Sequence, residues 1–218
     1  MFASTASGSP GHKLSPPVQR LLRICANVVG AGSAVVFSYQ FLHFYIQSHR
    51  LIGIVFFCQQ TLVALAYLIR RPARFASRRL DDWLLAFGGT FAGVLFRPQG
   101  AHPAWGVRTG LILQLIGVAI VLTSLLTLGR SFGFTAADRG LVIRGPYAVV
   151  RHPMYLSYLF LQGGYLMQSI SLANAGVLLF GTMCNVGRAL AEERVLARNP
   201  EWGAYRTRVR WRVIPGLW

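Results

Sequence analysis

The chain has very little negative charge. Six of its 218 residues are Asp or Glu, against 22 Lys and Arg, so the net charge is +16. Charged residues of both signs make up 13% of the chain, where a soluble domain has about a quarter, and hydrophobic residues make up 54%. This composition excludes an ordinary soluble domain and indicates an integral membrane protein.

The sequence also lacks the patterns of several site classes. Its three cysteines, Cys25, Cys58 and Cys184, have no paired spacing, so we expect packing residues and neither a disulfide framework nor a metal site. A Gly-x-Gly-x-x-Gly nucleotide loop is absent, since the run from Gly129 to Gly133 does not match it.

The excess positive charge has two readings. In a soluble protein it would suggest nucleic acid. Here the arginines lie in the gaps between apolar runs, where they meet anionic lipid headgroups. We therefore expect membrane lipids as partners, and no nucleic acid.

Six apolar segments predict an all-α, polytopic membrane protein with five to six transmembrane helices. They are Ile24–Gln47, Leu51–Ile69, Trp83–Phe96, Val107–Leu128, Met154–Met167 and Ile170–Ala191. The third is short and follows Asp81-Asp82, which we expect to neutralise the preceding arginines or to begin that helix. The last two form a helical hairpin that turns at Gln168-Ser169.

The segments divide the chain into three parts. Residues 1–17, rich in Ser, Pro and Gly, predict a disordered tail; residues 18–128 hold the N-terminal transmembrane helices; and residues 129–218 form a C-terminal core of loop, hairpin and tail. With six crossings, 19 of the 22 basic residues fall on one side of the membrane, and Arg50, Arg97 and Arg108 fall on the other. The positive-inside rule then places both termini and the loop of the core on the cytoplasmic side.

The loop before the hairpin carries a candidate site for an anion. It ends at Pro153, which suits the first position of a helix because its missing N–H would have no partner there. Arg151 and His152 then precede a helix N-terminus, where free backbone N–H groups favour an anion. Alternatively, both residues only cap the bilayer interface.

The far end of the hairpin supplies the opposite charge. Two of the six acids, Glu192 and Glu193, are adjacent there, and Arg188 lies four residues before Glu192 on the same helix face. They form either a salt-bridged helix exit at the interface or, together with the Arg151 loop, a pocket with both signs of charge that is open to the cytosol and bordered by lipid.

The spacing of several short motifs resembles one family of integral membrane enzymes. The motifs are Arg130-Ser131-Phe132, Gly140-Leu141-Val142, Gly145-Pro146-Tyr147, Arg151-His152-Pro153-Met154-Tyr155, Glu192-Glu193, and the ending with Trp202, Tyr205 and Pro215-Gly216. Together they resemble the isoprenylcysteine carboxyl methyltransferase and phospholipid methyltransferase family over about residues 125–218. The three N-terminal segments carry no motif of this kind.

The resemblance implies methyl transfer from S-adenosylmethionine at the cytoplasmic side. It implies that Leu141 and Val142 border the adenine and that Glu192 or Glu193 holds the amino group. The residues implied to line the cofactor site are Tyr147, Arg151, His152 and Tyr155; those implied in catalysis are Arg188, Glu193 and His152. The cofactor carries a carboxylate, an ammonium and a sulfonium, so a site with both signs of charge suits it.

The acceptor stays open at this stage. Apolar walls predict a lipophilic molecule that enters from the bilayer: a carboxylate like that of isoprenylcysteine, a lipid amine, or a small thiol. A carboxylate needs no general base, whereas an amine or hydroxyl has to lose a proton, for which His152 or a glutamate is the nearby candidate. The sequence does not fix the oligomeric state.

Two other functions compete with methyl transfer. The His152-Pro153-Met154-Tyr155 stretch and the ending with Trp202, Tyr205 and Ile214-Pro215-Gly216 also resemble sterol-type membrane reductases, which use NADPH. The adjacent Glu192 and Glu193 would repel the 2′-phosphate of that cofactor. A non-catalytic membrane scaffold or transporter component is the second alternative, and it would bind neither cofactor.

Overall fold

The structure is a computed structural model that describes residues 16–49 and 51–218, and its helical content confirms the all-α prediction. The long helices are α1 (Pro16–Ser48), α2 (Leu51–Ile69), α3 (Leu80–Phe91), α4 (Ala104–Leu128), α5 (Pro153–Gln168) and α6 (Leu172–Leu196). A short α7 (Trp202–Arg208) follows, with 3-10 turns η1 (Ala92–Leu95), η2 (Gly129–Ser131) and η3 (Gly145–Ala148). The tail predicted to be disordered spans residues 1–17. Residues 1–15 lie outside the described residues, and the last two already belong to α1, which begins at Pro16.

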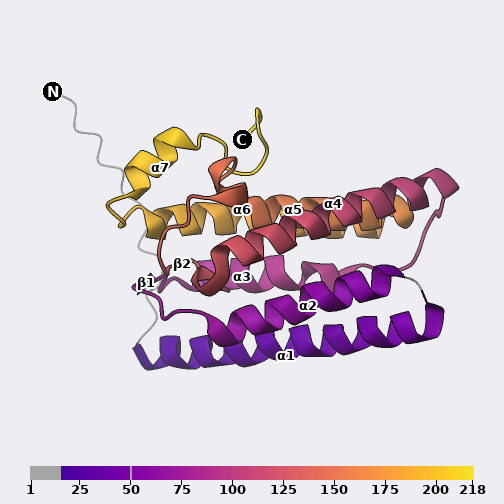
Figure 1. Ribbon diagram of the computed structural model, residues 1–218, viewed down its shortest axis with the longest axis horizontal. Helices are drawn as coiled ribbons and strands as arrows, with labels where there is room; N and C mark the ends of the chain where they lie inside the picture. The colour runs from indigo at the N-terminus through magenta and orange to yellow at the C-terminus, as the bar shows by residue number, and fades with distance from the viewer. Residues whose placement is uncertain (1–15, 50) are drawn as a thin grey trace.

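The six long helices lie side by side and alternate in direction (Figure 1). α7 and a two-residue strand pair share one end of the bundle, and the loops at 96–103 and 169–171 meet at the other through a bridge between Ala101 and Ile170. The loop that precedes α5 therefore lies at the same end as the exit of α6.

The predicted apolar segments each fall in a helical region. Ile24–Gln47 lies inside α1, Leu51–Ile69 is α2, and the third segment is divided between α3 and η1. Among the described helices, Ala104–Ser131 is the stretch that is both long and apolar enough to cross a bilayer by itself, while the apolar Gly53–Ile69 is shorter. The other crossings remain predictions.

The predicted start of the hairpin at Pro153 is confirmed, whereas its turn lies at residues 169–171 and α6 continues to Leu196, beyond the predicted end at Ala191. Pro153 occupies the start of α5, and α5 ends at Gln168. The side chain of Ser171 caps α6 by accepting a hydrogen bond from the backbone N–H of Asn174. The side-chain amide of Asn174 in turn donates to the carbonyls of Arg97 and Ser169, which fixes the loops at that end.

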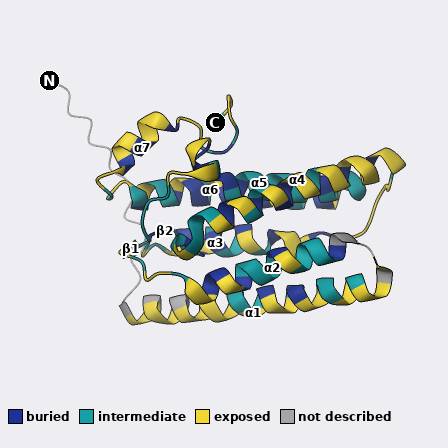
Figure 2. Cartoon of the chain, in the orientation of Figure 1, coloured by how far each residue is buried: buried dark blue, intermediate teal, exposed yellow. Residues whose placement is uncertain are grey.

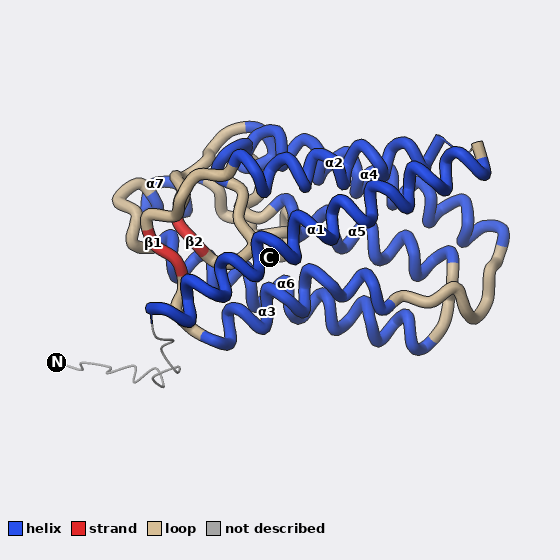
Figure 3. The backbone as a smooth tube through the Cα atoms, turned by 90° about the horizontal axis from the view of Figure 1, so that it is seen from below, coloured by secondary structure: helices blue, strands red, loops and turns tan. Residues whose placement is uncertain are grey.

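Strand pairing ties the loop before α5 to the connection between α2 and α3. The strand β1 (Phe75–Ala76) runs antiparallel to β2 (Ala137–Asp138), and Figure 3 shows the pair at the end of the bundle that also holds α7. As expected, Asp81 pairs with the preceding Arg79. Asp82 is buried and instead pairs with Arg194 of α6 at 2.6 Å, a contact that joins α3 to α6.

The surface of the bundle is rich in apolar side chains. Figure 2 shows long exposed stripes on α1 and α4, and they include Leu126 and Val28. Leu68 of α2 is 75% exposed and Leu172 of α6 is 91% exposed. Such faces are suited to lipid because the helices satisfy their own backbone hydrogen bonds. Of the cysteines, Cys184 is buried, whereas Cys25 and Cys58 are exposed, so the packing role expected for those two is wrong within the single chain.

Small residues set the distance between neighbouring helices. A Cβ on Gly30 would meet the ring of Tyr67, and a Cβ on Gly89 would meet Asn185, so both glycines allow a neighbouring helix to pack closely. Gly93, by contrast, has open space around its Cβ position. α4 and α5 also approach closely, since Gly110 and Gly164 each face the backbone of the other.

Gly164→Ala should destabilise the protein, whereas Gly163→Ala should not. A Cβ at Gly164 would lie 2.6 Å from the carbonyl oxygen of Gly110, so the two helices would have to separate. Overpacking of this kind costs about 1 to 3 kcal/mol. A Cβ at Gly163 meets nothing within 4 Å. The thermal unfolding midpoints of both variants in detergent test this, and equal midpoints would contradict close α4–α5 packing.

Candidate functional site

A cavity opens at the end of the bundle where the loop before α5, the start of α5 and the end of α6 meet. Its wall contains loop residues from Ser131 to Val142, Tyr147, and Trp202 and Tyr205 of α7. The N-terminal half also takes part, through residues that the sequence motifs did not indicate: Val63, Tyr67 and Thr90. The sequence offered one indication of a site here, since Tyr67 and Thr90 place polar groups inside apolar segments. Val63 offered none.

The structure brings most of the predicted site residues together at this cavity. Those that line it are Leu141, Val142, Tyr147, Arg151, His152, Tyr155, Arg188 and Glu192. Glu193 is the exception, since it is not among the lining residues. The two adjacent glutamates therefore occupy different environments.

Glu192 is the carboxylate of the cavity wall. The Tyr155 hydroxyl donates to its Oε1, and the His152 Nδ1 lies 3.3 Å from its Oε2. The side chain of Glu192 keeps 28% of its surface exposed, whereas His152 is 5% exposed. Glu192 is thus held from one side and accessible from the other.

Glu193 is held by two arginines. Arg151 Nη1 donates to its Oε1 at 2.6 Å, and Arg212 Nε lies 3.1 Å from each carboxylate oxygen. The His152 Nε2 is 3.4 Å from the same Oε1. This clamp, formed by Glu193, Arg151, His152 and Arg212, joins α6 to the loop and to the C-terminal segment.

The C-terminal segment completes the clamp through its backbone. The N–H groups of Arg151 and His152 donate to the carbonyls of Trp211 and Arg212, and Arg151 Nη2 donates to the carbonyl of Arg210. The guanidinium of Arg212 lies over the ring of Trp218, 5.1 Å from its centroid. Sequence reasoning missed Arg212, because one arginine among seven after residue 187 carries no distinguishing pattern.

One N–H group of the Arg151 side chain has no hydrogen-bond acceptor among the described residues. The side chain is 6% exposed, and the group in question is the Nε–H. A buried donor without a partner is costly, so a ligand acceptor at this point of the cavity wall would stabilise the site.

Arg188 is buried among neutral groups. It donates to the Thr90 hydroxyl at 3.2 Å and to the Phe134 carbonyl at 3.1 Å. It also lies over the Tyr155 ring. No ion pair joins it to Glu192 or to another described carboxylate, although Glu192 follows one turn later on the same helix. Its charge therefore faces the cavity without a direct counterion in this part of the chain.

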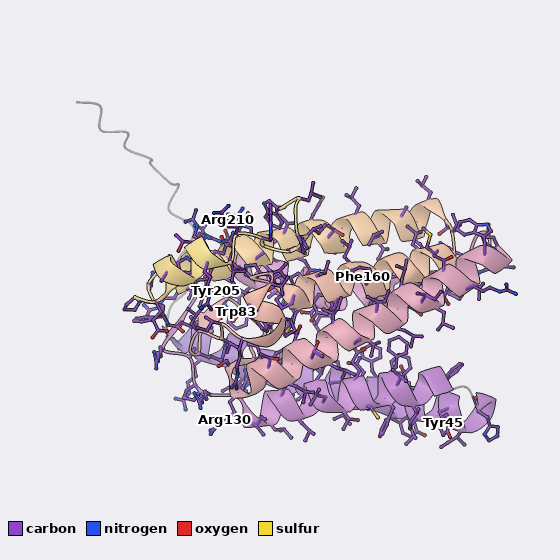
Figure 4. All side chains as sticks on the ribbon, turned by 45° about the horizontal axis from the view of Figure 1, so that its top comes forward. Tyr45, Trp83, Arg130, Phe160, Tyr205 and Arg210 are labelled. Carbon is purple, nitrogen blue, oxygen red and sulfur yellow. The ribbon has the colours of Figure 1, made fainter. Side chains whose placement is uncertain are left out.

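The wall also contains several aromatic side chains. The Tyr205 hydroxyl donates to the carbonyl of Tyr147 at 2.8 Å and so fixes α7 on the loop. Figure 4 shows Tyr205 and Trp83 toward the same end of the bundle, with Tyr45 at the opposite end. Burial raises the pKa of Tyr147 well above its usual range, and the charge of Glu192 adds to this, so the phenol stays protonated.

The ionised carboxylates and His152 stabilise each other. Burial by itself would lower the pKa of His152, but its contacts with Glu192 and Glu193 raise it above 6.5. Burial would likewise raise the pKa of Glu193, but the hydrogen bond from His152 and the charges of His152, Arg151 and Arg212 hold it below its usual range. The two carboxylates thus favour the charged form of His152, and the charged form of His152 favours ionised carboxylates.

Folding stability should therefore be highest over an intermediate pH range and should fall at both lower and higher pH. The raised pKa of His152 contributes stability that is present below 6.5 and is lost as the pH rises through the folded-state pKa. The lowered pKa of Glu193 contributes stability that is lost as the pH falls through its folded-state value. Thermal unfolding midpoints across the pH range measure both losses of stability. His152→Asn should remove the loss of stability at high pH. The control His102→Asn, at the opposite end of the bundle, should keep that loss. A loss of stability at high pH that persists without His152 would contradict the assignment.

The comparison with known families identifies this region. Residues 105–199 match the sequence model of the phospholipid methyltransferase family. No curated protein sequence matches the chain. The matched residues run from the start of α4 to just before α7 and so include the loop, the hairpin and the clamp apart from Arg212. The resemblance read from the motifs is confirmed for those that lie within residues 105–199: these residues carry a domain of the phospholipid methyltransferase family of membrane methyltransferases, which includes the isoprenylcysteine carboxyl methyltransferases.

Proposed function

We propose that this protein is an integral membrane methyltransferase that uses S-adenosylmethionine and acts on a lipophilic acceptor. The observation that carries the proposal is a cavity, lined mainly by the methyltransferase family domain, whose wall combines an accessible carboxylate, two buried guanidinium groups and several aromatic rings. The cofactor carries a carboxylate, an ammonium and a sulfonium, and this set of groups matches all three.

The residues present fit the cofactor. Glu192 would hold the ammonium group because it faces the cavity with part of its surface exposed. Arg151 would hold the carboxylate through its unpaired Nε. Leu141 and Val142 would border the adenine, with Tyr147 and Tyr155 as further walls. Glu193, which the sequence offered as an equal candidate, would act through the clamp by orienting Arg151 and His152.

The chemistry would require little from the protein beyond alignment and exclusion of water. The cofactor supplies a methyl group that is already activated by its sulfonium. The aromatic wall and the loop would keep water out, and Arg188 would orient the polar end of the acceptor. For an amine or hydroxyl acceptor, His152 could take the proton, since Glu192 and Glu193 stabilise its charged form. A carboxylate acceptor would need no such step.

The acceptor would come from the bilayer. The cavity lies at the end of a bundle with an apolar surface, and Val63, Leu128 and Met154 add apolar side chains to its wall. We propose a multi-pass topology with both termini and the cavity on the cytoplasmic side. Its support is the alternation of the six long helices, which gathers the arginine-rich segments at the cavity end (Figure 1).

Glu192→Gln should weaken binding of S-adenosylmethionine to the purified protein by about tenfold or more. The substitution removes one charge-assisted hydrogen bond, worth about 1.5 to 3 kcal/mol, and keeps the shape of the side chain. Glu201→Gln is the matched control, because Glu201 is exposed at the start of α7 and does not line the cavity. Isothermal titration calorimetry measures both.

Two results would redirect the proposal. Binding of NADPH in place of S-adenosylmethionine would favour the sterol-type reductase. Binding of neither would favour the non-catalytic scaffold. A screen of lipid extracts with labelled methyl groups on the cofactor then identifies the acceptor and distinguishes a carboxylate, an amine and a thiol.

Arg188→Lys should separate cofactor binding from methyl transfer. Lysine keeps the charge but lacks the planar fork that reaches both Thr90 and the Phe134 carbonyl. If Arg188 orients the acceptor, affinity for S-adenosylmethionine stays within a few-fold while the transfer rate drops by about tenfold or more. Parallel loss of binding and rate would assign Arg188 to the cofactor, and full activity would leave it without either role.

A further inference from the structure

The surface beside the cavity combines exposed arginines with exposed apolar side chains. It is formed by the end of the loop before α5, by α7 and by the C-terminal segment that follows α7 at residues 209–218. Neither the family motifs nor the proposed cofactor site uses its residues. We call this surface the basic-apolar face and define it by the exposed residues Val149, Arg206, Arg208, Arg210, Trp211 and Leu217.

Hydrogen bonds join the loop to the part of the chain that follows α6. Arg208 Nη2 donates to the carbonyl of Ile143 at 3.3 Å. The side chain of Arg151 donates to the carbonyl of Arg210, and its backbone N–H donates to the carbonyl of Trp211. The loop, α7 and the C-terminal segment therefore form one continuous surface.

The C-terminal segment lies against helices that belong to the predicted membrane spans. Val213 packs with Tyr155 of α5 and Ala189 of α6 in one buried cluster, and Trp218 packs against that cluster. Tyr155 and Ala189 are near the cavity ends of two apolar segments predicted to cross the bilayer. Figure 1 shows the C-terminus alongside the helices. The basic-apolar face is therefore at the depth where a predicted span meets the lipid headgroups.

The three arginines of the face form no ion pair with the part of the chain that the structure describes. Four of the six acids contact other basic residues. Of the remaining two, Asp138 is buried, and Glu201, just before α7, forms no ion pair with any described residue. The face thus keeps a positive charge that attracts an anionic partner.

The apolar side chains decide which anionic partner fits. Trp211 is 39% exposed and Leu217 is 76% exposed, next to the arginines. Arginine together with exposed tryptophan and leucine is typical of a segment that lies in a membrane interface, where the cation meets phosphate and the apolar side chain enters the acyl boundary. An acidic soluble protein would match the charge, but it would not reach a segment that packs beside the membrane spans.

The face is joined to the proposed cofactor site through Arg212. This residue follows Trp211 directly, and its Nε donates to Glu193 while its guanidinium lies over the ring of Trp218. Glu193 also accepts from Arg151, whose free Nε would hold the cofactor carboxylate. The position of the C-terminal segment therefore bears on how Arg151 is oriented.

We propose that the basic-apolar face binds the anionic phospholipid surface of the bilayer and that this contact holds Arg212 in the clamp. S-adenosylmethionine should then bind more tightly in an anionic bilayer than in a neutral one. Lipid binding stands on the face alone, whereas its effect on cofactor affinity rests on the proposed methyltransferase function.

Lipid binding is tested by fluorescence quenching of the full chain in nanodiscs. The signal of Trp211 is the difference between the native chain and Trp211→Phe. Brominated phosphatidylglycerol should quench this signal more strongly than the same fraction of brominated phosphatidylcholine, and high salt should reduce the preference because it screens the charges. Equal quenching by the two lipids would overturn the proposal and would leave the face to an acidic soluble partner.

The effect on the cofactor is tested by calorimetry in nanodiscs of phosphatidylcholine, alone or mixed equally with phosphatidylglycerol. Affinity for S-adenosylmethionine should be about fivefold or more higher in the anionic discs. The double variant Arg206→Gln, Arg210→Gln should lose this difference. The matched control Arg71→Gln, Arg78→Gln removes two exposed arginines between α2 and α3 and should keep it.

The outcomes separate the two proposals. A difference between discs that persists in the Arg206 and Arg210 variant would mean that the anionic discs only concentrate a cationic cofactor, and it would overturn the coupling. Equal affinity in both discs would overturn the coupling and leave the methyltransferase function standing. Failure of the native chain to bind S-adenosylmethionine in either disc would refute that function, while the quenching of Trp211 would still decide whether the face binds anionic lipid.

Discussion

The ionic clamp around Glu193 is the interaction on which the site depends. A single carboxylate receives Arg151 from the loop, His152 from the start of α5 and Arg212 from the C-terminal segment. These parts are separated by up to about sixty residues in the chain, and the positive charges of Arg151 and Arg212 would repel each other without Glu193. Removing one partner of a buried ion pair typically costs about 3 to 5 kcal/mol. The clamp therefore joins the loop, the end of α6 and the C-terminal segment beside the cavity.

The clamp also explains why two adjacent glutamates are needed. Consecutive residues of a helix point about 100° apart, so two adjacent carboxylates can contact different groups on two sides of the helix. Glu193 is occupied by arginines and joins the parts of the chain, whereas Glu192 keeps exposed surface on the cavity side. In a chain with six acids, Asp82 has a comparable joining role between α3 and α6. Because Glu193 and Asp82 are paired with arginines, Glu192 is the carboxylate that the cavity wall presents.

The two halves of the chain contribute unequally to the site. The C-terminal half supplies the charged groups, and the N-terminal half supplies Val63, Tyr67 and Thr90 as wall. Thr90 holds Arg188, and the T-shaped contact between Tyr67 and Phe132 fixes the loop against α2. Under the proposed function, this division would keep cofactor binding in the half that matches the family, while the less recognisable half would shape the space for the acceptor.

The sequence by itself determined the all-α class, the helix that starts at Pro153, the family and most of the residues around the cavity. These follow from local properties: apolar runs form helices, proline begins them, and motifs keep their spacing. Tertiary structure decided which glutamate faces the cavity, that Arg212 completes the clamp, that Asp82 pairs with Arg194, and that the C-terminal segment packs against α5 and α6. These features depend on helix rotation and on contacts between residues far apart in the chain, which no local pattern in a single sequence encodes.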